Sequence, residues 1–122
     1  MKNLEDLEVY KLAEDLADSI WDICIGWDYF SKDTIGKELV KAADSICANI
    51  AEGFGRFHYK ENINFLYFAR GSLEETRDWL RRASRRDLLN EEEFKLFQEK
   101  IDKIGKKLNS YINSIKKQFS GN

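Results

Sequence analysis

The chain has 122 residues, of which 43% are hydrophobic and 34% charged, with seven glycines and no proline. This length suits one domain, and the composition favours amphipathic helices joined by short turns and excludes a disordered chain. The formal net charge is −2, and no window approaches about 18 uncharged apolar residues, so we expect a cytoplasmic protein without a membrane-spanning or signal segment.

Four stretches of the chain carry apolar residues at the spacing of an amphipathic helix. They cover about residues 6–26, 33–54, 59–86 and 91–118, and GWDYFSKD interrupts the pattern between the first two. Four helices of this length with short connections pack most readily as an antiparallel up-down-up-down four-helix bundle. We therefore predict an all-α fold and a single domain over residues 1–122, with the first helix diagonal to the third.

The fourth helix has the clearest pattern and the clearest start. Its apolar residues alternate steps of three and four, as in the seam of a left-handed bundle: Phe94, Phe97, Ile101, Ile104, Leu108, Tyr111 and Ile115. In LNEEEF, Asn90 can cap the helix while Glu93 returns a bond to the Asn90 backbone. We therefore place the start of this helix at residue 91.

The stretch NIAEGFGR places two glycines within three residues. A phosphate-binding loop needs glycines that follow a strand and open a helix, whereas Gly53 and Gly55 follow a helical pattern. We interpret them as the exit of the second helix, closed by a residue with positive φ, where glycine meets no Cβ penalty.

The residue types that usually carry catalysis or bind metals are few. Cys24 and Cys47, on consecutive antiparallel helices, are offset by about 16 Å, which exceeds the ~7 Å limit for a disulfide, so we expect free thiols. His58 is the only histidine, and no second histidine, nearby cysteine or carboxylate cluster completes a metal site or a nucleophile. We therefore expect no enzyme, no metal and no cofactor.

Charge is unevenly distributed along the chain. Residues 1–30 hold two basic and eight acidic residues, a net charge of −6, whereas residues 56–122 hold fifteen basic and ten acidic residues, a net charge of +5. A polyanionic partner is compatible with the acidic total because one basic face is enough to bind it.

The third helix carries an arginine stripe at the edge of its core face. At about 100° per residue from Leu73, its members fall at roughly 60°, 40°, 80° and 120°: Arg70, Arg77, Arg81 and Arg85. Arg82 and Arg86 fall on the far side. Glu74 is spaced to neutralise Arg70 and Arg77, which leaves Arg81 and Arg85 without an acid on their own helix or on the diagonal first helix.

Two explanations of this stripe remain open. It meets the acidic outer face of the first helix of a neighbouring subunit in a head-to-tail ring, or it meets phosphate, which arginine binds with a fork of donors. Lys103, Lys106 and Lys107 on the fourth helix would extend a phosphate-binding surface.

The opposite flank of the third helix is rich in aromatic residues. Phe65, Phe68 and Trp79 fall at about −80° to −140°, outside the arc that a four-helix core usually fills. We predict an oligomer interface there; a role in the core or as a plug at the end of the bundle is the alternative.

Three motifs resemble one protein family. DLEVYKLA, NIAEGFGR and NFLYFARGSLEET are similar to motifs of the four-helix-bundle proteins encoded in intervening sequences of bacterial 23S rRNA genes. The accessory variability determinant proteins of diversity-generating retroelements are similar to that family. The resemblance implies a small bundle that forms a homopentameric ring and has no established activity. Where the family tends to carry a serine that caps the third helix, this chain has His58, which puts the capping box with Glu61 in doubt.

Two functions follow as hypotheses. The first is a non-enzymatic, homo-oligomeric binding or scaffolding protein that contacts the phosphate backbone of RNA or DNA through Arg77, Arg81, Arg85 and the three lysines. A basic stripe of this kind carries no sequence specificity. The second, implied by the resemblance, is a module that docks a protein partner such as a reverse transcriptase and does not bind nucleic acid. A copy without a ligand of its own also remains open.

Overall fold

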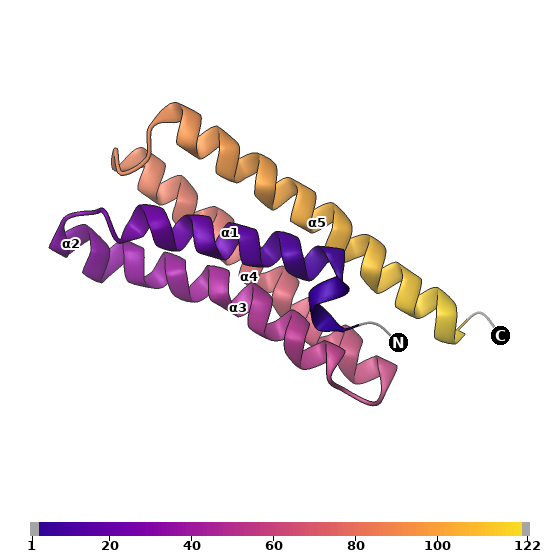
Figure 1. Cartoon of the computed structure of the whole chain (residues 1–122). Coiled ribbons are helices and arrows are strands. Elements are labelled where there is room, and N and C mark those ends of the chain that lie inside the picture. Colours follow the sequence, from indigo (N-terminus) through magenta and orange to yellow (C-terminus); the bar gives the residue numbers. More distant parts are fainter. Residues whose placement is uncertain (1–2, 121–122) are drawn as a thin grey trace.

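The computed structural model describes residues 3–120 and contains four long helices (Figure 1). They are α1 (Glu8–Cys24), α3 (Lys37–Phe54), α4 (Tyr59–Arg85) and α5 (Glu91–Ser120), with a short α2 (Tyr29–Ser31) before α3. Residues 3–120 contain no strand, and the all-α prediction is confirmed. Residues 1–2 and 121–122, which the predicted domain includes, lie outside the described part of the chain.

The long helices form an antiparallel bundle in up-down-up-down order. α3 packs against both α1 and α4, and α5 packs against α4 and α1, so that α1 and α4 are diagonal (Figure 1). The α1–α3 connection and the α4–α5 connection lie at one end of the bundle, and the α3–α4 turn lies at the other. The predicted topology is confirmed.

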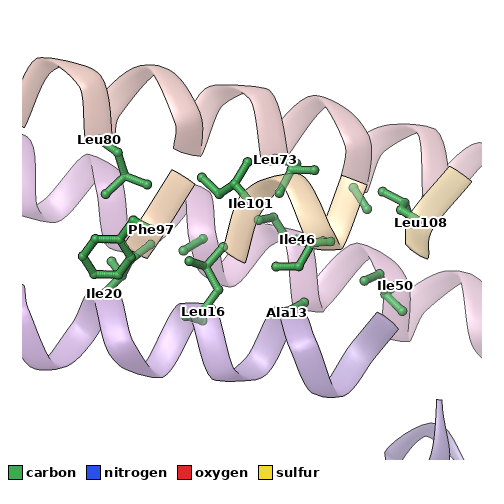
Figure 2. Close-up of a cluster of buried hydrophobic side chains, with 14 of the residues drawn as sticks. Ala13, Leu16, Ile20, Ile46, Ile50, Leu73, Leu80, Phe97, Ile101 and Leu108 are labelled. Carbon is green, nitrogen blue, oxygen red and sulfur yellow. The ribbon is translucent and has the colours of Figure 1, made fainter. Parts of the chain in front are cut away.

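All four long helices contribute to one hydrophobic core. Figure 2 shows side chains of all four helices in this core, among them Leu16 and Ile20 of α1, Ile46 of α3, Leu73 of α4 and Ile101 of α5. These five side chains are almost fully buried. The helical spacing of apolar residues therefore produces the core that it predicts.

The connection between α1 and α3 is shorter than the sequence suggests. Asp28 caps α2 by accepting a hydrogen bond from the Ser31 backbone N–H at 3.4 Å. The chain then continues through a π-helical turn, Lys32–Gly36, into α3. Only the residues between Cys24 and Tyr29 are non-helical, because the cap starts a new helix inside GWDYFSKD.

The predicted exit of the second helix at Gly53 and Gly55 is correct, since α3 ends at Phe54 and Gly55 is its C-cap residue, but the predicted positive φ is wrong. No described glycine has a positive φ, and Gly55 ends α3 with a φ of −80°. Gly53 lies buried inside α3, where a Cβ atom would come within 2.6 Å of Asn62 Oδ1 and 2.9 Å of the Asn62 backbone oxygen. Gly53 is therefore required by the close approach of α3 and α4.

A residue with positive φ is found at the end of α4 instead. Asp87 has a φ of 61°, which aspartate tolerates better than most residues. The Leu88 N–H then donates to the Ala83 oxygen at 2.9 Å, and the Asp87 N–H donates to the Ser84 oxygen at 3.1 Å. This pair of bonds is the Schellman motif, which satisfies carbonyl groups at the end of a helix.

The predicted cap of α5 is present. The Asn90 side chain accepts a hydrogen bond from the Glu93 N–H at 2.7 Å, and the Glu93 carboxylate accepts one from the Asn90 N–H at 2.9 Å. α5 then begins at Glu91, as the sequence predicts.

Candidate nucleic-acid interface

Four arginines converge at the C-terminal end of α4. Arg81, Arg82, Arg85 and Arg86 line a hollow of about 380 Å³, which we call the arginine hollow. The sequence predicts Arg82 and Arg86 on the far side of the helix, outside the arginine stripe. The structure brings them together with Arg81 and Arg85 around one hollow, because positions i, i+1, i+4 and i+5 form two neighbouring rows on a helix.

The carboxylate of Asp78 forms ion pairs with two arginines of the hollow. Asp78 Oδ1 lies 2.6 Å from Arg81 Nη2, and Asp78 Oδ2 lies 3.1 Å from Arg82 Nε. The hydrogen bond from Arg81 lowers the pKa of Asp78. The prediction that Arg81 has no acid on its own helix is wrong, since Asp78 stands three residues before it. Among the described residues, Arg85 and Arg86 have no carboxylate partner.

Arg70 and Arg77, nearer the N-terminal end of α4, turn toward α5. Arg77 pairs with Glu74 at 3.2 Å and with Asp102 of α5 at 2.8 Å, and the hydrogen bond to Asp102 raises its pKa. Arg70 donates to Asn109 of α5 instead of pairing with Glu74. Neither contact with α5 is predicted from the sequence, because both depend on the register between two helices.

The three predicted lysines do not share one face of α5. Lys107 pairs with Glu8 of α1 at 2.5 Å, and Lys103 is near enough to contribute to lowering the pKa of Glu8. Lys106 lies one turn from Asp102 and from Asn109, which both contact α4, so it lies on the α4 side. The structure therefore divides the six predicted residues among the arginine hollow, the α4–α5 contact and the α1–α5 contact.

The acidic first helix is partly neutralised within the chain. Glu8 pairs with Lys107, and Asp15 pairs with Lys100, both from α5. The α5 side of α1 therefore needs no neighbouring subunit to balance it. The alternative in which the arginine stripe meets α1 of a neighbouring subunit stays a prediction, and it can involve only the acids of α1 that these two pairs leave over.

The predicted aromatic flank lies on the α3 side of α4. Ser72 donates a hydrogen bond to Ser45 of α3, and Trp79 stands two turns after Ser72 on the same face. Phe68 is 60% exposed and meets Phe65 edge-on at 5.8 Å between ring centroids. Trp79 is half-buried, and the Arg82 guanidinium lies over its ring at 5.0 Å. Phe68 is thus the member of this set with the largest exposed surface.

His58, Cys24 and Cys47 are of the residue types that carry catalysis or bind metals. His58 lies before the first turn of α4 with no capping bond from its side chain, as the departure from the family motif suggests. Cys24 and Cys47 are free, and burial raises the pKa of each to about 12. Within residues 3–120, no cluster of histidine, cysteine and carboxylate side chains is placed to bind a metal ion. None of the described helices is both long and apolar enough to cross a membrane.

Comparisons with known proteins identify the family. A family model described as 23S rRNA-intervening sequence protein matches residues 5–110, so the chain belongs to this family. One similar solved structure is a protein with unknown function from the S23 ribosomal protein family of Bacteroides thetaiotaomicron. It is 23% identical, with a TM-score of 0.77, over 85% of this chain and 97% of that one, and so supports the fold. A search of curated proteins finds no match.

Proposed function

We propose that this member of the 23S rRNA-intervening sequence protein family is a non-enzymatic, homo-oligomeric protein that binds the phosphate backbone of RNA or DNA. The observation that carries the proposal is the arginine hollow, in which four guanidinium groups surround one site. Each guanidinium offers a planar fork of donors that matches phosphate oxygens. The family description, which refers to ribosomal RNA, is consistent with such a ligand. We also propose a cytoplasmic location, where such a ligand would be met.

The four arginines differ in how readily they can accept a phosphate. Arg85 and Arg86 have no carboxylate partner among residues 3–120, so their donors are available. Arg81 and Arg82 share Asp78 through exposed ion pairs, and exposed pairs are weak enough to exchange partners. A bound phosphate would therefore contact Arg85 and Arg86 first and compete with Asp78 for the other two.

Lys106 gives the proposed surface its length. Arg77 of α4 lies opposite Asp102 of α5. Arg85 lies eight residues after Arg77, and Lys106 lies four residues after Asp102. Because the two helices are antiparallel, these steps lead in opposite directions along the bundle. At about 1.5 Å per residue, the two side chains are about 18 Å apart along the bundle. This distance corresponds to about five base-pair steps of a duplex. Lys103 would add charge at the edge of the surface, whereas Arg77 and Lys107 would have to exchange their present partners.

We propose that the oligomer forms through Phe65, Phe68 and Trp79. Phe68 is 60% exposed, and a neighbouring subunit in a closed assembly would cover it. The family resemblance suggests a homopentamer. Repetition of the arginine hollow around such a ring would raise the affinity for a long polyanion through avidity.

A second candidate function is a module that docks a protein partner, such as a reverse transcriptase-like protein, without contacting nucleic acid. It is favoured by the pairing of Arg77, Arg81 and Lys107 within the chain. Those pairs reduce the number of cations that are available to phosphate. The two functions differ in their dependence on salt.

The test measures binding of a fluorescein-labelled oligouridylate of about 20 nucleotides by fluorescence anisotropy. If four phosphates are neutralised, the affinity should fall about 50-fold between 50 and 200 mM salt, and if two are neutralised, about sevenfold. The double variant Arg85→Gln, Arg86→Gln should therefore bind the oligouridylate more weakly, and its affinity should fall only about sevenfold over the same salt range. Lys11→Gln, Lys60→Gln removes the same charge from exposed sites on α1 and at the opposite end of α4 and should behave as the parent.

Light scattering on the same variants separates ligand binding from assembly. The Arg85→Gln, Arg86→Gln protein should keep its oligomeric state, whereas Phe68→Glu should dissociate. If the arginine variant becomes monomeric, the hollow belongs to a subunit contact. If the parent protein binds the oligouridylate with no salt dependence, or does not bind it at all, the phosphate proposal is wrong.

A further inference from the structure

A cluster of exposed apolar side chains surrounds the turn between α1 and α3. Trp21 is 54% exposed, Ile25 51%, Tyr29 79% and Phe30 74%. All four lie at the α2 end of the bundle (Figure 1). Large apolar side chains that gather in one region of a surface, instead of being scattered singly, are typical of an interaction site.

Two of these side chains line a groove between α1 and the start of α3. Trp21 of α1 and Ile25, which directly follows α1, stand one turn apart and line a hollow of about 310 Å³ together with Val40 of α3. The buried Cys24 also lines the hollow, and the surface of the hollow is almost entirely apolar. The groove is therefore suited to an inserted apolar side chain.

The π-helical turn contributes to the shape of this groove. Gly36, the last residue of the turn Lys32–Gly36, also lines the groove and carries no side chain to fill it. A Cβ atom there would lie 3.5 Å from the Trp27 ring and 3.7 Å from Cys24 Cβ. π-Helical turns are rare and occur frequently at functional sites.

The end of the groove that contains the apolar hollow is positively charged. Lys32, Lys37 and Lys41 are the charged residues that line the apolar hollow, and each is exposed. None of the three has an ion-pair partner within residues 3–120. A ligand seated in the hollow would therefore meet positive charge at its rim.

Toward the middle of the bundle the same groove is acidic. Glu14 and Asp18 of α1 and Asp44 of α3 are exposed and lie close enough to Cys47 to raise its pKa, second to burial. Asp18 lies one turn before Trp21 on α1 and Asp44 lies one turn after Val40 on α3, so the two carboxylates continue the two sides of the hollow. Asp18 also contributes, second to burial, to raising the pKa of Asp44. Asp44 lies seven residues after Lys37 on α3, about 10 Å along the helix.

From this pattern we infer that the α1–α3 groove docks an amphipathic helical segment of a protein partner, with an apolar anchor between an acidic end and a basic end. The anchor would enter the hollow beside Trp21 and Ile25, as in other complexes in which a helix lies in a groove. The acidic end would meet Lys32, Lys37 and Lys41, and the basic end would meet Asp18 and Asp44. This inference goes beyond the phosphate-binding function proposed above and does not depend on it.

The test uses three synthetic helical peptides of about 18 residues with one shared leucine face. One carries glutamates at one end and lysines at the other, one carries only glutamates, and one carries only lysines. Binding is measured by fluorescence anisotropy of labelled peptides on the full chain. The peptide with both charges should bind about tenfold more tightly than either of the others, since each lacks one set of exposed charge pairs.

Variants of the groove locate the binding. Ile25→Glu should weaken binding of the mixed peptide at least tenfold, whereas Phe57→Glu, at a side chain that is 93% exposed at the other end of the bundle, should not. Lys37→Glu, Lys41→Glu should shift the preference toward the all-lysine peptide. A shift of this kind requires that the peptide lie beside those lysines.

Several outcomes would overturn the inference. One is that none of the peptides binds, and another is that all three bind equally. A third is that the preference survives the lysine reversal. If Ile25→Glu dissociates the oligomer seen by light scattering, the groove is a contact between copies of this chain, and the inference of a separate partner is wrong.

Discussion

Replacing Gly53 with alanine tests whether the contact between α3 and α4 is as close as the structure indicates. The added Cβ would lie 2.6 Å from Asn62 Oδ1, 2.9 Å from the Asn62 backbone oxygen and 3.1 Å from Phe65 Cβ. The side-chain oxygen could rotate away, but the backbone oxygen could move only if α4 moved. Asn62 Oδ1 is buried and accepts no hydrogen bond from the described residues, which is consistent with tight packing.

The expected magnitude follows from two opposing effects. Alanine is favoured over glycine inside a helix by about 1 kcal/mol, whereas overpacking of this kind costs about 1–3 kcal/mol. Because a backbone atom takes part, we expect a cost near the upper end and a net loss of about 1–2 kcal/mol. Gly71 is the matched control, since a Cβ there would have no neighbour within 4 Å. Gly71→Ala should stabilise the protein by about 1 kcal/mol.

Thermal unfolding followed by circular dichroism measures both effects. The two variants should differ by about 2–3 kcal/mol, or roughly 10 °C in melting temperature for a chain of this size. Protein concentration must be equal in all samples because assembly would shift the transition. Asn62→Ala should recover part of the loss in Gly53→Ala, since the two sites are in contact. If Gly53→Ala is stabilised as much as Gly71→Ala, the proposed close approach is wrong.

Three further predictions concern the cap, one ion pair and the thiols. Asn90→Ala should lower the free energy of unfolding by about 1 kcal/mol through loss of the cap, measured by urea denaturation; no change would contradict a role for the capping box. The pKa of Glu8 should lie below 4.5 and return toward that value in Lys107→Gln, as followed by NMR titration. Because folding lowers this pKa, the stabilising contribution is present above pH 4.5 and is lost as the pH falls through the lowered pKa; an unshifted pKa in the parent protein would argue against the pair. Cys24 and Cys47, whose pKa values are raised to about 12, should react with iodoacetamide at pH 8 far more slowly in the folded protein than after unfolding. Equal rates would show that the thiols are not protected by burial.

Much of the fold could be predicted because its signals are local. The seam of α5 follows from the spacing of Phe97, Ile101, Ile104 and Leu108, which are all buried. The start of α5 follows from Asn90 and Glu93, whose reciprocal hydrogen bonds join residues three positions apart. A pattern confined to one or two helical turns is readable without knowledge of the neighbouring helices.

The candidate site was only partly predictable. The predicted phosphate-binding residues include Arg81 and Arg85 but not Arg82 and Arg86, because the prediction placed each arginine only by its angle from the core face of the helix. The repeat in RRASRR was the available signal, since adjacent pairs spaced four apart form two neighbouring rows on a helix. Asp78 was also a local signal, at three and four residues before Arg81 and Arg82.

The sequence by itself determined the helices, the topology that short connections favour and the presence of an arginine-rich end of α4. Only the tertiary structure decided which charges remain available, since the pairing of Arg77 with Asp102 and of Lys107 with Glu8 depends on how two helices are aligned. It also decided why Gly53 is a glycine and where the apolar groove lies. These features depend on distances between helices, and those distances are fixed only when the side chains pack together.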